Sequence, residues 1–119
     1  MIDDLGRVMS IKITDNETHE TYELDFSRDS IRFAEKNGFK LEEVPVFPVT
    51  KFPELFYYAL RMHHKNLART QTDALYRKLG GYTEKFLERL IMLYNQAACS
   101  NNLIEEEEAE KNSLMTVEM

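Results

Sequence analysis

Histidine is the first side chain to consider for chemistry, because it titrates near neutral pH and binds metal ions. The chain has three histidines: His19, and the adjacent pair His63 and His64. On a helix, adjacent side chains point about 100° apart, so they do not readily bind one metal ion, unlike a pair four residues apart. His63 also falls on an expected apolar helix stripe, which favours a packed, hydrogen-bonded core histidine over a ligand. His19 belongs to an expected turn, and we predict no metal site.

The carboxylates, the thiol and the glycine pair of the sequence likewise predict no catalytic or cofactor site. Glu84 and Glu88 are four residues apart, but basic residues interleave them, as on a solvated helix face. Cys99 is the single cysteine, and without a predicted basic neighbour we expect an inert, semi-buried thiol. Gly80 and Gly81 are not followed by the Lys and Ser or Thr of a phosphate-binding loop. The sequence therefore predicts a protein that is not an enzyme, with no cofactor.

Length and composition bound the fold and the cellular setting. The chain of 119 residues is 43% hydrophobic and 30% charged, which is typical of one soluble globular domain. The lone cysteine excludes an internal disulfide and suits a reducing cytoplasm. The N-terminal MIDDLGRVMS lacks the order of a signal peptide, and no apolar run is long enough to span a membrane. We expect a cytoplasmic protein that does not enter membranes.

Charge is distributed unevenly along the chain. The net charge is −6, but residues 105–119 hold six Glu and one Lys, which leaves about −1 for residues 1–104. We therefore predict one globular domain over 1–104 and an acidic, disordered tail over 105–119. This balance disfavours nucleic acid as a partner. A loose group of basic residues is interpreted as a solvated helix face: Arg61, Lys65, Arg69, Arg77 and Lys78.

An N-terminal β-hairpin is predicted over about residues 7–26. Apolar and polar residues alternate in VMSIKIT and again in TYELDF, which is the pattern of two half-buried strands. The intervening DNETHE is polar and turn-rich. Because a two-stranded hairpin is marginally stable alone, its apolar face must pack on helices.

The first helix begins after this hairpin. Ser27 is the expected N-cap, and it places Phe26 and Ile31 at the spacing of a hydrophobic staple. Asn37 and Gly38 are expected to end the helix, because glycine tolerates the left-handed conformation after a C-cap. The following KLEEVPVFPV, with two prolines, is predicted to be an extended connector across the surface.

Three further helices are predicted, which gives an α+β, mainly α fold with helices over about 28–104. Thr50 is the expected N-cap of the second helix, with Pro53 in its first turn. Thr70 and Asp73 predict a capping box for the third helix, which ends at Gly80 and Gly81. The fourth helix starts at Thr83 and is apolar over a wide arc. The second helix carries this apolar stripe: Phe52, Leu55, Phe56, Ala59, Leu60, His63 and Leu67.

Two tyrosines flank that stripe and suggest a contact surface. Tyr57 and Tyr58 lie about 120° and 140° from its centre, so both cannot enter one core. We expect both rings to be partly exposed and to contact a partner together with Met62, with Met92 as a further contact residue. Packing against the hairpin is the alternative.

The order of these parts resembles the tail assembly chaperones of long-tailed bacteriophages of Gram-positive bacteria. The resemblance covers about residues 7–100 and rests on YELDFSRDSI, EKNGF, the proline connector, PELFYYALRMHH, LIMLYNQA and the acidic tail. It implies a mainly helical protein that self-associates, binds the tape measure protein and recruits tail tube subunits. It also implies a place in the host cytoplasm and absence from the finished virion.

Two other functions fit the same residues. A small helical domain with an unidentified partner needs no further feature. An acidic decoy, or antitoxin-like protein, would occupy a basic surface through the Glu-rich tail. Deletion of the tail distinguishes the decoy from the chaperone, because a decoy would lose its binding and a chaperone would keep most of it.

Overall fold

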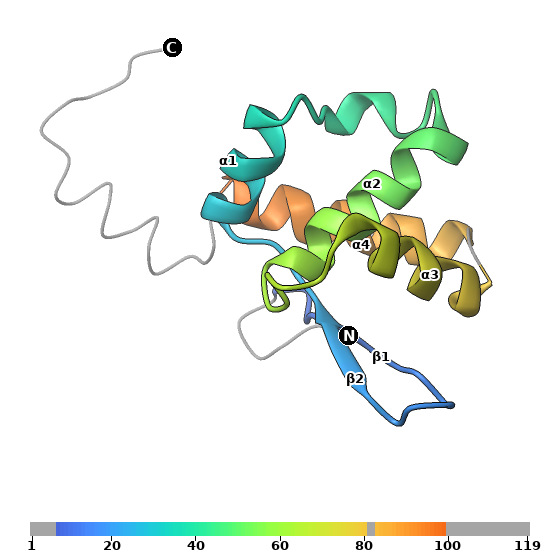
Figure 1. The fold of residues 1–119 in the computed structure, drawn as a ribbon. Helices are drawn as coiled ribbons and strands as arrows, with labels where there is room; N and C mark the ends of the chain where they lie inside the picture. The colour runs from blue at the N-terminus through green and yellow to red at the C-terminus, as the bar shows by residue number, and fades with distance from the viewer. Residues whose placement is uncertain (1–6, 81–82, 100–119) are drawn as a thin grey trace, which may run out of the picture.

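The fold is a β-hairpin followed by helices, as a computed structural model describes it for residues 7–80 and 83–99. This confirms the predicted α+β, mainly α architecture. The predicted domain end at residue 104 and the predicted acidic tail, 105–119, lie outside the described residues. None of the described helices combines the length and apolarity that crossing a membrane requires. In chain order the elements are β1 (Ile11–Thr14), β2 (Thr21–Leu24), α1 (Arg28–Lys36), the 3-10 helix η1 (Leu41–Glu43), α2 (Pro48–Arg61), α3 (Arg69–Leu79) and α4 (Glu84–Cys99) (Figure 1).

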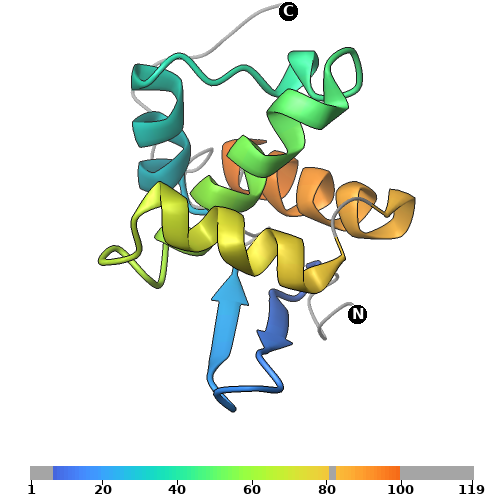
Figure 2. The ribbon, with the colours of Figure 1, turned by 45° about the vertical axis from the view of Figure 1, so that its right-hand side comes forward.

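The hairpin forms within the predicted range. β1 and β2 pair antiparallel, with Ile11 opposite Leu24 and Ile13 opposite Tyr22, so the apolar residues share one face. Leu24 is fully buried where β2 meets the helices. His19 has a positive φ of 64° in the connecting turn, as its position in a turn predicts. Both views show the hairpin projecting from the helices (Figures 1 and 2).

The predicted start of α1 is confirmed. The Ser27 hydroxyl oxygen accepts from the Ser30 N–H at 3.1 Å, and the Ser30 hydroxyl oxygen accepts from the Ser27 N–H at 2.8 Å. This reciprocal pair is a capping box with serine in place of the usual glutamate. Phe26 and Ile31, at the staple positions, are both buried in the core.

The predicted end of α1 is confirmed as well. Gly38 has a φ of 86°, in the left-handed region that glycine tolerates. The Phe39 N–H then donates to the Ala34 carbonyl, and the Gly38 N–H donates to the Glu35 carbonyl, both at 3.0 Å. These two bonds make a Schellman motif and direct Phe39 into the core.

The start of α2 differs from the prediction. The helix begins at Pro48, so Thr50 lies in its first turn and is not the N-cap. Proline has φ fixed near the helical value and suits the first helical position, which favours the earlier start. The Phe47 carbonyl accepts from the Lys51 N–H at 2.8 Å. Pro53 consequently lies inside the helix, not in its first turn, and the predicted extended connector contains η1.

The end of α2 also differs, and the prediction of a core histidine at position 63 is wrong. The helix ends at Arg61, and His63 is exposed in the turn that follows. The N–H groups of His63 and His64 both donate to the Leu60 carbonyl, at 3.3 and 3.0 Å, which tightens the last turn. The apolar stripe counted to Leu67 therefore runs past the true helix.

α3 begins at Arg69, one residue before the predicted cap. Thr70 is inside the helix, and the N-cap is Ala68, whose N–H donates to Oε1 of Gln71 at 2.8 Å. The side chain that reaches back to the N-cap is therefore Gln71 and not the predicted Asp73. Gly80 ends the helix with a φ of 94°, as predicted.

α4 begins where the sequence predicts. The Phe86 N–H donates to Oγ1 of Thr83 at 3.3 Å, and the helix starts at Glu84. Cys99, expected to be semi-buried, is exposed at the other end of the helix. The helix turns these residues into the core: Leu87, Leu90, Leu93, Tyr94 and Ala97.

α2 is the central element of the fold. It contacts α1, α3, α4, β2 and η1, and most of its apolar side chains are fully buried. The ring of Phe52 stacks on Phe86 of α4 at 5.8 Å between centroids, and Phe56 meets Tyr76 of α3 edge-on at 5.5 Å. Aromatic contacts of this kind stabilise a core beyond the area they bury.

The basic residues do not form one solvated helix face. The Arg61 guanidinium lies 3.7 Å from the ring centroid of Phe33, in cation–π geometry. Nε of Arg69 is 2.9 Å from Oδ1 of Asp73, one turn further along α3. Lys65 and Arg77 are exposed, and Lys78 contacts the hairpin.

Candidate functional site

Tyr58, expected to be partly exposed, is buried. Only 7% of its surface is accessible. The centroid of its ring lies 5.4 Å from that of the Phe39 ring and 6.1 Å from that of the Phe33 ring. Burial raises the pKa of the Tyr58 phenol. Phe33 of α1 and Phe39, which follows that helix, cover the Tyr58 ring. The hairpin, which the sequence offered as the alternative covering element, does not supply these contacts. The prediction of exposure is therefore wrong for Tyr58, which helps to hold α1 on α2.

Tyr57 and Met62 are half-buried on α2 and the turn after it. The Tyr57 ring meets the Tyr58 ring edge-on at 5.0 Å, and the Arg69 guanidinium lies 5.9 Å from the Tyr57 centroid. Met62 lines a small hollow between α1 and the end of α2, beside Phe33. A contact role for Tyr57 and Met62 stays a prediction.

Met92 is exposed and lies beside an apolar hollow. The hollow has a volume of about 570 Å³ and opens between β1 and α4. Ile11, Phe86 and Met92 supply its apolar wall, and we name these three residues the β1–α4 surface. Nη2 of Arg89, on α4, donates to the carbonyl of Met9, two residues before β1, at 3.0 Å. A contact role for Met92 likewise stays a prediction.

A second apolar surface lies where the chain enters α2, and sequence reasoning missed it. Val46, Phe47 and Val49 are 65%, 55% and 89% exposed, and we name them the α2-entry surface. Figures 1 and 2 place this segment at the end of the molecule opposite the hairpin. The available signal was VPVFPV, in which prolines interrupt an apolar run. The two prolines indicate a connector and, by themselves, assign no role to its apolar side chains.

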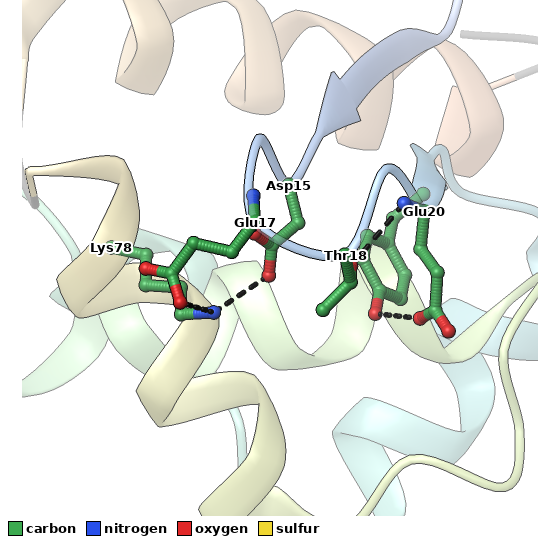
Figure 3. Close-up of polar contacts among 6 residues, drawn as sticks. Asp15, Glu17, Thr18, Glu20 and Lys78 are labelled. Atoms are coloured by element: carbon green, nitrogen blue, oxygen red, sulfur yellow. Dashed lines mark hydrogen bonds and ion pairs between the residues drawn. The ribbon is translucent and has the colours of Figure 1, made fainter.

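The hairpin turn is fastened to α3 by charged groups. Figure 3 shows the Lys78 ammonium directed at the turn, where Nζ is 2.8 Å from Oδ2 of Asp15 and 3.8 Å from Oε2 of Glu17. The hydrogen bond from Lys78 is the main cause that lowers the pKa of Asp15. On the other side of the turn, the Tyr22 hydroxyl donates to Glu20 at 2.6 Å, which raises the pKa of Tyr22 to about 12.

Where β2 meets the end of α2, polar groups gather that the sequence does not place together. Oε2 of Glu23 accepts from the Ser10 hydroxyl at 2.6 Å and lies 3.8 Å from Nε2 of His63. The Ser10 bond is the main cause that lowers the pKa of Glu23. Burial raises the pKa of Asp25, two residues on. His64, the neighbour of His63, accepts a hydrogen bond from the Glu23 N–H through Nε2 at 3.0 Å.

Comparison with known proteins gives a family. No curated protein and no solved structure matches the chain. The family model of a domain of unknown function, DUF5055, matches residues 3–119. The chain therefore belongs to the DUF5055 family.

Proposed function

We propose that the chain is a non-enzymatic bacteriophage tail assembly chaperone that binds the tape measure protein and recruits tail tube subunits. It acts in the cytoplasm of the bacterial host and is not part of the finished virion. The sequence resemblance supports a role as a tail assembly chaperone. The structural observation that carries this proposal is the exposed α2-entry surface. Binding of nucleic acid or of a membrane is no part of this proposal.

The α2-entry surface has the chemistry of a protein-contact site. A single exposed apolar residue is ordinary, but Val46, Phe47 and Val49 fall within four positions and are all more than half exposed. Pro45 precedes this segment and Pro48 lies within it, and both limit its conformations, so less entropy is lost when a partner orders it. The segment therefore suits repeated binding and release of an apolar client.

A helical client suits these surfaces. An amphipathic helix binds by setting apolar side chains, spaced three or four residues apart, against an apolar patch. Methionine adapts its shape to different partners, which is useful on the β1–α4 surface, where Met92 is exposed. A chaperone that coats a long client needs many copies, and we assign self-association to the β1–α4 surface.

Co-expression tests this function. The untagged tape measure protein of the same phage is produced with the affinity-tagged chain, and the soluble fraction is purified on the tag. We expect the tape measure protein to stay soluble and to co-purify only when the chain is present. A tape measure protein that is insoluble with and without the chain, or that fails to co-purify, would contradict the proposal.

A shortened chain separates the chaperone from the decoy. Deletion of residues 105–119 removes six Glu and one Lys from a chain of net charge −6. We expect the shortened chain to keep most of its binding to the tape measure protein, because the α2-entry surface is intact. Loss of binding on deletion would favour an acidic decoy that acts through its tail.

A further inference from the structure

Three potential metal ligands converge where β2 meets the turn after α2. Glu23 and Asp25 come from one end of the hairpin, and His63 lies about forty residues further along the chain. One donor atom from each residue lies within 4.8 Å of the donor atoms of the other two. The side chains of His63 and Glu23 are 37% and 35% exposed, so an ion reaches them from solvent.

Two hydrogen bonds hold β2 against the end of α2 and so set this arrangement. The Asp25 N–H donates to the Ala59 carbonyl at 3.1 Å, a carbonyl that the tightened helix end leaves free. The Glu23 N–H donates to Nε2 of His64 at 3.0 Å. The main chain beside both carboxylates is therefore fixed to the last turn of α2 and to the following turn, which carries His63. A preorganised backbone reduces the cost of bringing ligands together.

The donor set indicates the class of ion. Imidazole nitrogen with two carboxylate oxygens suits zinc and neighbouring divalent transition ions, whereas magnesium and calcium prefer oxygen alone. Three protein ligands with the remaining position open to water is a frequent arrangement for zinc. The Ser10 hydroxyl, which donates to Glu23 at 2.6 Å, would orient that carboxylate as an outer partner.

The distances are close to those that coordination needs. Two ligands about 2.1 Å from one tetrahedral ion are separated by about 3.4 Å. Nε2 of His63 and Oε2 of Glu23 are 3.8 Å apart. Movement of the two side chains by a few tenths of an ångström brings this pair to that separation, and the donor atom of Asp25 lies within 4.8 Å of both.

We propose that Glu23, Asp25 and His63 form a binding site for one divalent transition ion of the zinc class. A bound ion would join the hairpin to the end of α2 and stabilise the contact between them. This site is separate from the α2-entry surface, and the proposal does not depend on a chaperone function.

The test uses the full chain with its affinity tag removed, because a polyhistidine tag itself binds zinc. After treatment with a chelator and removal of the chelator, the chain is titrated with zinc by calorimetry and with cobalt by visible absorption. We expect one equivalent of zinc to bind and the melting temperature to rise. We also expect cobalt to give the absorption of a site with nitrogen and oxygen ligands. Magnesium at the same concentration should give no such rise.

Three conservative variants test the ligands: Glu23→Gln, Asp25→Asn and His63→Gln. Each should weaken zinc binding by more than the roughly 10–100-fold that loss of an outer partner costs. The matched control is His19→Asn, which removes an exposed histidine outside the cluster at a position of positive φ that asparagine tolerates. Circular dichroism and melting without metal show whether each variant folds.

The outcomes separate a metal site from an ordinary ion pair. Zinc binding lost in the three folded variants and kept in His19→Asn supports the proposal. An absent zinc response in the wild type, or an equal response in all four variants, overturns it. An equal rise in melting temperature with magnesium also overturns it, because simple screening of the two carboxylates would then account for the effect.

Discussion

The Glu23 N–H of β2 donates a hydrogen bond to Nε2 of His64, 3.0 Å away in the turn after α2. This bond requires that Nε2 of His64 carries no hydrogen, because a ring nitrogen that accepts cannot also donate. The same ring meets Tyr22 edge-on at 5.4 Å between centroids. His64 therefore joins the hairpin to the helices by one polar and one aromatic contact.

Replacement of His64 should weaken this junction. We expect His64→Ala to lower the free energy of unfolding by about 1–2 kcal/mol, because the partly buried Glu23 N–H loses its acceptor. Urea denaturation followed by circular dichroism measures the change. His19→Asn, in the exposed turn, should unfold like the wild type. Equal stability of His64→Ala and the wild type would show that this bond contributes nothing.

The contact between Lys78 and Asp15 predicts a dependence on pH. The pKa of Asp15 is lowered from its usual 3.8, chiefly by the hydrogen bond from Lys78, so its carboxylate stabilises the fold above that value. This contribution is lost as the pH falls through the lower folded pKa. The pKa of Lys78 is raised from 10.5, so its contribution is complete below that value and is lost as the pH rises through the higher folded pKa.

The variant Lys78→Gln removes both effects. We expect it to melt below the wild type by the same small difference between about pH 5 and 9, and the difference to vanish well below the usual Asp15 pKa of 3.8. High salt should reduce the difference at neutral pH only in part, because the Lys78 side chain is 45% exposed whereas that of Asp15 is 6% exposed. A difference that persists at pH 2 would mean that Lys78 acts through packing of its stem.

The adjacent tyrosines should respond differently to truncation. Tyr58→Ala opens a cavity between α1 and α2 and should lower the free energy of unfolding by about 3–5 kcal/mol. Tyr57→Ala removes a half-buried ring and should cost clearly less. Thermal and urea unfolding measure both, and Tyr58→Phe is the control that keeps the ring. Similar costs for the two alanine variants would contradict the placement of Tyr58 in the core.

Local signals in the sequence predicted the elements whose ends depend on neighbouring residues. Ser27 caps α1, and Gly38 and Gly80 end their helices, because a cap or a positive φ acts within a few residues. Alternation of apolar residues likewise located both strands. These interactions are complete within one segment, so the sequence contains the information needed to recognise them.

The errors arose where contacts between distant segments decide the outcome. Helical periodicity continues past Arg61, yet the chain leaves the helix there and the Ala59 carbonyl bonds the Asp25 N–H. The burial of Tyr58 depends on where α1 packs, which no periodicity reveals. The group of Glu23, Asp25 and His63 was missed for the same reason, since the fold brings these residues together.

The central claim is that the α2-entry surface binds the tape measure protein. Its most direct test is the affinity of the double variant Phe47→Ser, Val49→Ser for the purified tape measure protein, measured by calorimetry. Position 47 is the N-cap of α2, where serine is favourable, so the helix should stay intact and the melting temperature unchanged.

Leu79→Ser, at an exposed apolar residue of α3, is the matched control for this measurement. We predict that the double variant binds at least tenfold more weakly than the wild type, a loss of about 1.4 kcal/mol. The control should bind like the wild type. A double variant that is folded and keeps wild-type affinity would contradict the claim.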